Sequence, residues 1–443
     1  MTSNILPLDL GDGLLLRQPS WQDAVALAAF NVRIHSDNPH DPELWLGEWT
    51  KDLLRGDHPT TRATDFTLVE DRRAAGKIVS SAVLIPQVWR YEDVPFDVGR
   101  PELIGTDEGY RRRGLVRKQM DILHQWSDER GHLAQVITGI PFFYRRFGYE
   151  MALTLGGAKI FAHDQLRELK VPREENLKVR EATPADLDDL ERFYARHCSF
   201  GMISRVRDEK EWLYEMHGAN DSSPYKRNFH LVEVAASGEP VGYFDFASRA
   251  SEEYAGVREI AAAPGHSLRA VALRAARYLR DLNPQEGASA PEARTVTFIL
   301  GRQHPVYQAL ARELLPYREP YAWYIRVPHL STFLETICPV LERRLAESVV
   351  AGYTGSVRLN CTYDFLQLQW ERGKLDSIDC FEPQHFFDGD AFFPGRTFLQ
   401  LLFGFRDIQA LQDAHPDLEC SREAYVLLSA LFPRKPSMPL GLA

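Results

Sequence analysis

One short pattern occurs twice in this chain, and it constrains the fold more than any other feature. Residues 14–23 (LLLRQPSWQD) and 177–186 (LKVREATPAD) each begin with an apolar stretch that contains an arginine and then reach a Ser or Thr. The apolar stretch predicts a strand, and Ser20 or Thr183 is a good N-cap for the amphipathic helix that follows. Two copies of this strand–turn–helix pattern predict two related α/β units in tandem.

The 443 residues are enough for more than one hydrophobic core. We expect a first unit over residues 1–165 and a second over 175–328, joined by a charged linker around 167–175. From there on the pattern changes to helices, three consecutive strands and helices again, which predicts a third domain over residues 330–443.

Within the first unit, residues 113–130 carry apolar side chains at helical spacing, and Gly131 ends the helix. The second unit repeats this order, with a helix over 268–281 before its last strand. Apolar runs predict the strands of the first unit, over residues 65–70, 78–88, 102–106 and 134–138.

The run from Ile104 to Lys118 (IGTDEGYRRRGLVRK) takes the chain from a strand through a tight loop into a helix. The first amides of a helix lack intrahelical partners and carry the positive end of its dipole, so they form an anion site suited to a pyrophosphate. Gly114 permits close approach of a phosphate to the backbone, and the arginines can add charge-assisted hydrogen bonds. Taken alone, the pattern also fits a basic helix start on the surface.

A second segment, residues 136–150 (VITGIPFFYRRFGYE), follows at a suitable interval. An aromatic core cluster would explain Phe143 and Phe147, but it would not explain why both motifs occur in this order. Together they resemble the GNAT superfamily of acyl-CoA-dependent N-acetyltransferases, whose loop has the pattern R/Q-x-x-G-x-G/A. Val116 stands where that pattern has Gly or Ala.

The RRRGL loop and the Y-x-R-F-G-Y segment further resemble the enhanced intracellular survival (Eis) type of bacterial acetyltransferase. The likeness is motif-specific only between Ile104 and Tyr149; the run 392–404 is compatible with the C-terminal part of that family. The resemblance implies an α/β fold made of two tandem GNAT-like mixed-sheet domains, the second degenerate, plus a C-terminal sterol-carrier-like α+β domain.

The same resemblance implies acetyl-CoA as co-substrate and no metal. By analogy, backbone groups of Ile104, Gly105 and Thr106 bind the pantetheine arm, with Gly139 and Ile140 beside it. The residues that would hold the pyrophosphate are Arg112, Arg113, Gly114, Leu115, Val116 and Arg117.

Tyr144 matches the general acid of the family. Attack of an amine on a thioester expels a thiolate, which a nearby phenol can protonate; the alternative is a core tyrosine. In the family the terminal carboxylate acts as general base, which here is Ala443, although the tail lacks an aromatic terminus. Glu102, on the strand that enters the loop, is the other candidate base, and Glu108 in the loop is a third.

The second unit lacks the phosphate-binding pattern, because its corresponding loop, residues 261–269, reads AAAPGHSLR. We therefore interpret it as a scaffold that walls the substrate pocket. His304 and Tyr307 lie near the position that corresponds to Tyr144, where a structural role is the simpler explanation.

The sequence thus predicts an N-acetyltransferase acting on an amine, either of a small aminoglycoside- or polyamine-like molecule or of a lysine side chain. The alternative is a non-catalytic acyl-CoA- or lipid-binding sensor. The acidic segment 37–57 has two interpretations, a pocket for a cation or a solvated helix face.

A formal net charge of −10 argues against a general nucleic-acid binder. The five scattered cysteines form no metal-binding pattern, and we expect reduced thiols. We expect neither a signal peptide nor a membrane span, and therefore a cytoplasmic protein. The family analogy implies a homo-oligomer, and specifically a hexamer.

Overall fold

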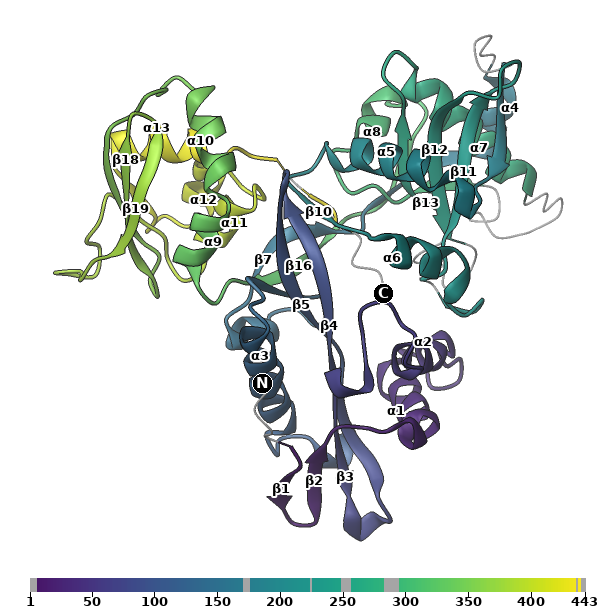
Figure 1. Ribbon diagram of the computed structural model, residues 1–443, viewed down its shortest axis with the longest axis horizontal. Coiled ribbons are helices and arrows are strands. Elements are labelled where there is room, and N and C mark those ends of the chain that lie inside the picture. The colour runs from purple at the N-terminus through teal and green to yellow at the C-terminus, as the bar shows by residue number, and fades with distance from the viewer. Residues whose placement is uncertain are drawn as a thin grey trace.

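The computed structural model describes residues 6–169, 176–223, 225–247, 256–282, 295–435 and 437–439. Its helices and strands form three lobes that meet around two long antiparallel strands, β4 (Lys77–Tyr91) and β5 (Val94–Thr106) (Figure 1). Parallel and antiparallel strands share sheets whose faces carry helices. The prediction of a mixed α/β fold is confirmed.

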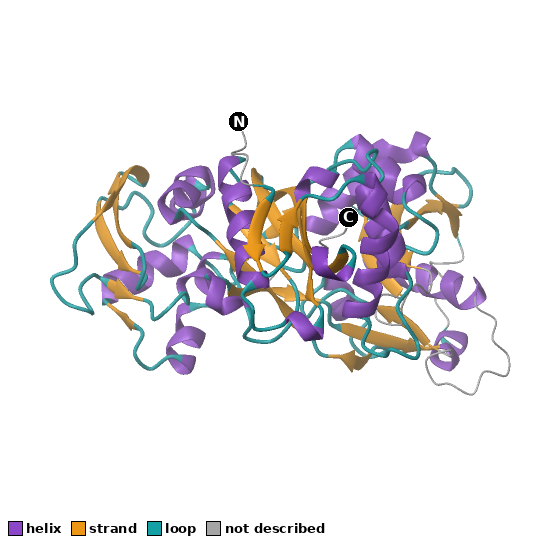
Figure 2. Cartoon of the chain, turned by 90° about the horizontal axis from the view of Figure 1, so that it is seen from below, coloured by secondary structure: helices purple, strands orange, loops and turns teal. Residues whose placement is uncertain are grey.

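The first sheet has the order β1-β2-β3-β4-β5-β6-β16-β7, with β10 paired to β4. Successive residues of a strand face opposite sides, so Leu68 packs toward α1 (Ala24–His35) and α2 (Trp45–Leu54), whereas Val69 packs toward α3 (Leu115–Glu129). Figure 2 shows these strands in the middle of the molecule with helices on both sides. The other strands are β1 (Leu8–Gly11), β2 (Leu14–Arg17), β3 (Phe66–Asp71), β6 (Ala134–Ile137), β7 (Glu150–Leu155), β10 (Ile203–Arg205) and β16 (Tyr321–Arg326).

The second sheet has the order β15-β8-β14-β13-β12-β11-β9. On one face Phe193 stacks on Tyr243 with ring centroids 5.8 Å apart, and on the other Val271 packs against Phe244. Its strands are β8 (Ala158–Ala162), β9 (Leu177–Glu181), β11 (Asn228–Val234), β12 (Pro240–Ala247), β13 (Gly256–Ala262), β14 (Thr295–Phe298) and β15 (Leu315–Arg318). The helices of this lobe are α4 (His163–Glu168), α5 (Leu187–Cys198), α6 (Glu209–Leu213), α7 (Leu268–Leu282) and α8 (Pro305–Ala309).

The two sheets exchange one strand each. β8 follows β7 directly in the sequence, yet it pairs with β14 and β15 of the second sheet. Conversely, β16 comes after the second sheet in the sequence and lies between β6 and β7 of the first. Both strands bury large side chains, Phe161 on β8 and Tyr324 on β16. A domain boundary near residue 165 therefore assigns β8 to the first unit, although β8 belongs to the sheet of the second. Each sheet contains one strand from the other half of the chain.

The third lobe packs against the ends of β4 and β5 that lie away from β1–β3 (Figure 1). Phe333 contacts the rings of Tyr91 and Phe96, with centroids 6.2 and 5.2 Å away, and Tyr91 donates a hydrogen bond to the carbonyl of Leu402. Its strands are β17 (Gly355–Asn360), β18 (Phe365–Glu371), β19 (Lys374–Cys380), β20 (Ala391–Phe392) and β21 (Glu419–Cys420). Its helices are α9 (Leu330–Thr336), α10 (Cys338–Ala346), α11 (Phe398–Leu402), α12 (Ile408–Ala414) and α13 (Arg422–Leu431).

After α13 the chain returns to the junction of the lobes. The hydroxyl of Ser437 accepts hydrogen bonds from the amides of Met202 and Ile203, and its carbonyl accepts one from Thr154. Ser437 is buried, so these bonds fix the position of the tail. Across the described ranges, no helix is both long and apolar enough to cross a membrane.

Candidate active site

The parallel strands β5 and β6 separate after a short region of contact. They pair at Val98 with Ala134 and at Gly99 with Gln135, and the pairing goes no further within the described residues. On the other side of β5, the pairing with β4 continues to Thr106 across a bulge, where Leu103 has a φ of 50°. The second half of β5 therefore presents unpaired backbone groups toward β6, and such an edge can bind an extended ligand that carries amides.

The loop after β5 is held in place from below. The amide of Asp107 donates to the carbonyl of Val79 at 2.8 Å, and the carboxylate of Asp107 pairs with Lys77 at 2.8 Å. Tyr110 donates a hydrogen bond to Asp71, and the guanidinium of Arg113 lies over the ring of Tyr110. These contacts hold the loop, together with the side chain of Arg113, in place.

Gly114 is the N-cap of α3 and has a φ of 75°, a backbone conformation that favours glycine. Leu115 is buried and anchors the helix to the sheet, whereas the side chains of Arg112, Arg113 and Arg117 are exposed. The first amides of α3 thus face solvent among three cations. This is the geometry of an anion site at a helix N-terminus.

A cavity of about 290 Å³ opens where β5 and β6 separate. We call it the central cavity. The first lobe supplies most of its lining, the exchanged strand β16 adds Trp323, and the second lobe adds Tyr225 and Arg258. The sequence-predicted residues that line it are Glu102, Ile104, Gly139, Ile140 and Tyr144. Gly105 and Thr106 continue β5 toward the loop that carries Arg111, Arg112 and Arg113, which we call the arginine loop. The hydroxyl of Ser80 bonds to both Gly105 and Thr106.

Tyr144 begins the short 3-10 helix Tyr144–Phe147 and is 6% exposed. A side chain at Gly139, which has a φ of 132°, would approach the Tyr144 ring to 3.1 Å, so glycine makes room for the ring. Burial is the main cause that raises the pKa of Tyr144, and Glu102 and Tyr324 raise it further. The phenol therefore keeps its proton at neutral pH.

Glu102 forms an ion pair with the buried Arg100, two residues earlier on the same face of β5. Both Nε and Nη2 of Arg100 contact Oε1 of Glu102, at 3.1 and 2.8 Å, and the hydroxyl of Thr138 lies 3.4 Å from the same oxygen. The guanidinium also lies over the rings of Trp323 and Trp49, 5.2 and 5.9 Å from their centroids. The Glu102 carboxylate is thus held firmly at the wall of the cavity.

His35, at the end of α1, lines the central cavity and was not predicted from the sequence. Burial lowers its pKa and the charge of Glu102 only partly opposes this, so the ring is neutral at pH 7. Its Nε2 is buried and has no hydrogen-bond partner among the described residues. A neutral imidazole can accept a proton. A single histidine after a helix carries no distinctive signal in the sequence.

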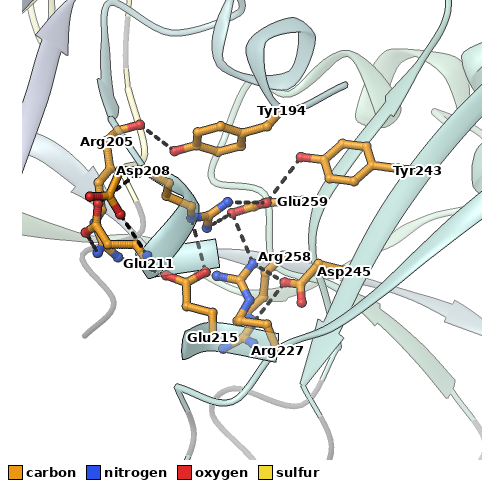
Figure 3. A network of polar contacts seen from close by, with 11 residues as sticks. Tyr194, Arg205, Asp208, Glu211, Glu215, Arg227, Tyr243, Asp245, Arg258 and Glu259 are labelled. Atoms are coloured by element: carbon orange, nitrogen blue, oxygen red, sulfur yellow. Dashed lines mark hydrogen bonds and ion pairs between the residues drawn. The ribbon is translucent and has the colours of Figure 1, made fainter. Parts of the chain in front are cut away.

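The wall from the second lobe belongs to a buried network of ion pairs (Figure 3). Arg258 Nε lies 3.4 Å from Oδ2 of Asp245, which also pairs with Arg227. Arg227 contacts Glu259, and Arg207 contacts the same carboxylate at 2.5 Å. These groups are at most 7% exposed, so the charges compensate each other inside the protein.

Met438 and Pro439 of the tail also line the central cavity. Ala443, one of the three candidate bases in the sequence, lies outside the described residues. In the second lobe, Tyr307 donates to the carbonyl of Phe298 at 2.7 Å and accepts from the amide of Leu300, and His304 accepts from the amide of Val306. These two side chains therefore hold backbone in place.

Residues 42–152 match the acetyltransferase (GNAT) domain. The matched range contains the separated strands, the arginine loop and Tyr144, and it supports acetyl transfer as the general activity. No curated protein matches the chain by sequence.

Solved bacterial structures share the fold over nearly the whole chain. The GCN5-related N-acetyltransferase from Anabaena variabilis ATCC 29413 superposes with a TM-score of 0.66 at 13% identity, covering 96% of this chain and 99% of that one. The corresponding protein from Kribbella flavida gives 0.62 at 17%, covering 97% and 100%. Eis1 from Mycobacterium abscessus gives 0.59 at 14%, covering 96% and 99%. At these identities the likeness concerns the fold alone.

Proposed function

We propose that this protein is an acetyl-CoA-dependent N-acetyltransferase that acetylates an amine in the central cavity. The observation that carries the proposal is the separation of β5 from β6, with the arginine loop at one end and Tyr144 beside the gap. A free strand edge, an anion site and a protonated phenol along one line fit the three parts of acetyl-CoA: amides, phosphates and thioester sulfur.

In this proposal the pantetheine arm pairs with the backbone of Ile104, Gly105 and Thr106, and Gly139 and Ile140 lie on its other side. The fit rests on the free edge of β5 and on Gly139, where a side chain would meet Tyr144. The pyrophosphate would be held by the first turn of α3, that is by Arg112, Arg113, Gly114, Leu115, Val116 and Arg117.

The reaction forms a bond from the amine nitrogen to the acetyl carbon and breaks the bond from that carbon to sulfur. Tyr144 would give its proton to the departing thiolate, because burial keeps the phenol protonated. The amine must also lose a proton. Glu102 and the terminal carboxylate of Ala443 are two of the three bases proposed from the sequence, with Glu108 of the loop as the third, and the structure adds His35, whose ring is neutral and lines the cavity.

We further propose that residues 177–318 with β8 form a second, degenerate unit of the same fold. The order β9-β11-β12-β13-β14-β8-β15 corresponds strand by strand to β2-β3-β4-β5-β6-β16-β7, including one parallel pair at the same place. For residues 330–443 we propose a sterol-carrier-like domain.

The test is consumption of acetyl-CoA with a panel of amines, together with calorimetric binding of coenzyme A. Turnover with at least one amine, lost in Tyr144→Phe while coenzyme binding is kept, supports the enzyme. Coenzyme binding without turnover of any amine would instead favour the non-catalytic acyl-CoA sensor.

A further inference from the structure

The charged side chains that line the central cavity are engaged by other groups of the protein. Among the described lining residues these are Arg100, Glu102 and Arg258. Arg100 pairs with Glu102, and Arg258 belongs to the buried network of ion pairs. In that network Arg205, Arg207, Arg227 and Arg258 are balanced by Glu211, Glu215, Asp245 and Glu259. The described wall therefore has no carboxylate left to neutralise a cationic ligand.

The acidic residues of α2 do not add a carboxylate to this wall. Glu48 pairs with Lys51, and Asp52 pairs with Arg55. The residues of α2 that line the cavity are Trp45, Leu46 and Trp49. Of the two interpretations of segment 37–57, the structure favours the one in which its acids lie outside the pocket.

The unpartnered side-chain nitrogens of this wall are mostly donors. Nε2 of His35 is buried without a hydrogen-bond partner among the described residues, and a neutral imidazole has one nitrogen that accepts. The indole nitrogens of Trp45, Trp49 and Trp323 are also buried without a partner there, but an indole N–H only donates. An ammonium carries three donors and no acceptor. A second or third ammonium would therefore meet donors and be buried without a counter-charge, which is costly.

The aromatic rings of the wall do not compensate several cations either. A ring face attracts an ammonium, but Arg100 already lies over the rings of Trp49 and Trp323. A ligand cation at the same faces would lie beside the guanidinium and be repelled by it. The rest of the wall suits an apolar ligand body. This further lining comes from Trp45, Leu46, Leu155, Tyr225, Met438 and Pro439.

The size of the central cavity limits the acceptor as well. Its volume of about 290 Å³ is at the lower end for ligand pockets, which span roughly 300–1,000 Å³. The acetyl group of the coenzyme would take up part of this space. A small acceptor therefore fits better than an oligosaccharide.

Resting on the proposed N-acetyltransferase function, we infer that the acceptor is a small primary monoamine with an aromatic body, that is, an arylalkylamine. Its ammonium first gives a proton to a base, and the neutral amine attacks the acetyl carbon. The nitrogen loses a second proton as the carbon–sulfur bond breaks, and the thiolate takes one from Tyr144. The product is an uncharged amide, which suits a wall whose charges are already balanced. Polyamines and aminoglycosides keep further ammonium groups throughout and are disfavoured for this reason.

The test compares amines that differ in one feature. Release of coenzyme A is measured with hexylamine and 1,6-diaminohexane, which differ by one ammonium, and with phenethylamine, spermine and kanamycin. In the wild type, kcat/KM for hexylamine is expected to exceed that for 1,6-diaminohexane by at least about 10-fold. The value for phenethylamine is expected to exceed that for hexylamine by about 5-fold, because aromatic rings attract each other beyond their apolar area.

Trp45→Glu places a carboxylate in the wall and is expected to lower the ratio of hexylamine to 1,6-diaminohexane by at least about 5-fold. Trp21→Glu is the matched control, because Trp21 is 59% exposed and does not belong to the cavity lining. Its ratio is expected to equal that of the wild type. A ratio within one variant does not depend on how much of that variant is folded.

A higher kcat/KM for 1,6-diaminohexane, spermine or kanamycin than for the monoamines overturns the inference and leaves the proposed activity standing. The same holds for a ratio that is equal in Trp45→Glu and the wild type. If no amine leads to release of coenzyme A, the inference and the proposed function both fail.

Discussion

The ring of Tyr144 packs edge-on against the ring of Tyr324, with centroids 5.6 Å apart and planes at 65°. Tyr324 lies on the exchanged strand β16, and its hydroxyl accepts a hydrogen bond from the amide of Phe142, close to Tyr144. The proposed acid of the first lobe is therefore positioned by a strand that follows the second lobe in the sequence. The exchange thus connects the integrity of both sheets to the geometry of the site.

Replacement of Tyr144 by Phe is expected to lower kcat by about 10²-fold or more, because the thiolate loses its proton donor. The Kd of coenzyme A should stay the same, since the hydroxyl is not among the groups proposed to hold it. Tyr307→Phe is the matched control in the second lobe, where the hydroxyl bonds to backbone groups, among them those of Phe298 and Leu300. Equal loss of kcat in both variants would remove Tyr144 from the mechanism.

Cleavage between β8 and β9, at a protease site introduced within residues 170–175, is expected to leave the two pieces bound together. β8 remains with the first piece but is paired with β14 and β15 of the second. Conversely, β16 remains with the second piece but is paired with β6 and β7 of the first. Gel filtration of the nicked protein should give one peak in buffer and two in denaturant. Phe161→Asp, which puts a charge into the core at β8, should weaken this association; separation of the wild-type pieces in buffer would contradict the prediction.

Features that depend on neighbouring residues could be predicted from the sequence. The helix expected over 113–130 extends from Leu115 to Glu129, and the strand expected over 65–70 is Phe66–Asp71. β5 was predicted only over 102–106, although it begins at Val94. Its first half contains Pro95, Gly99 and Pro101, which disfavour a strand locally, and its pairing with β4 overrides that preference.

Features that depend on distant residues could not be predicted. The apolar alternation of β8 and β16 is the same whichever sheet they join, so the strand exchange leaves no trace in either segment. Arg258 and His35 line the central cavity because α1, β5 and β13, which are far apart in the sequence, meet there. One signal for the buried network is the pair of charges Arg258-Glu259 within an otherwise apolar strand.

Loss of an arginine from the arginine loop is expected to raise the KM only of acyl donors that carry phosphates. Arg112→Ala should raise the KM for acetyl-CoA by about 10-fold or more, the size of one charge-assisted hydrogen bond of ~1.5–3 kcal/mol. The KM for acetyl-pantetheine, which lacks the pyrophosphate, should not change, and the difference should shrink at high salt. Arg196→Ala, an exposed position on α5, is the control. A parallel rise in both KM values would place the pyrophosphate elsewhere.

Removal of one partner from the buried network should be far more damaging than removal of a surface pair. Arg227→Met leaves Asp245 and Glu259 with less compensation, and the expected loss of unfolding free energy is about 3–5 kcal/mol. The exposed pair of Arg302 and Glu319, 3.3 Å apart, is the comparison, and Arg302→Met should cost under about 1 kcal/mol. Urea unfolding followed by tryptophan fluorescence measures both. Similar losses in the two variants would mean that an arginine of the buried network contributes no more to the unfolding free energy than an arginine of an exposed ion pair.

Acidification should destabilise the fold through buried histidines. Burial lowers the pKa of His58 to about 3 and that of His132 to about 4, from 6.5 in the unfolded chain. Both rings are held in the neutral form: His58 accepts from the amide of Thr61, and His132 Nδ1 lies 3.0 Å from the hydroxyl of Ser127.

Between pH 6.5 and about 4 the unfolded state binds a proton at each of these histidines that the folded state does not. The unfolding free energy therefore falls as the pH falls, by about 1.4 kcal/mol per pH unit for each histidine. Above pH 6.5 both states are neutral at these positions and the effect vanishes. Urea unfolding at pH 7, 6 and 5 measures the slope, and His132→Gln should lower it by the contribution of one proton. An unchanged slope in that variant would show that His132 is already protonated in the folded protein.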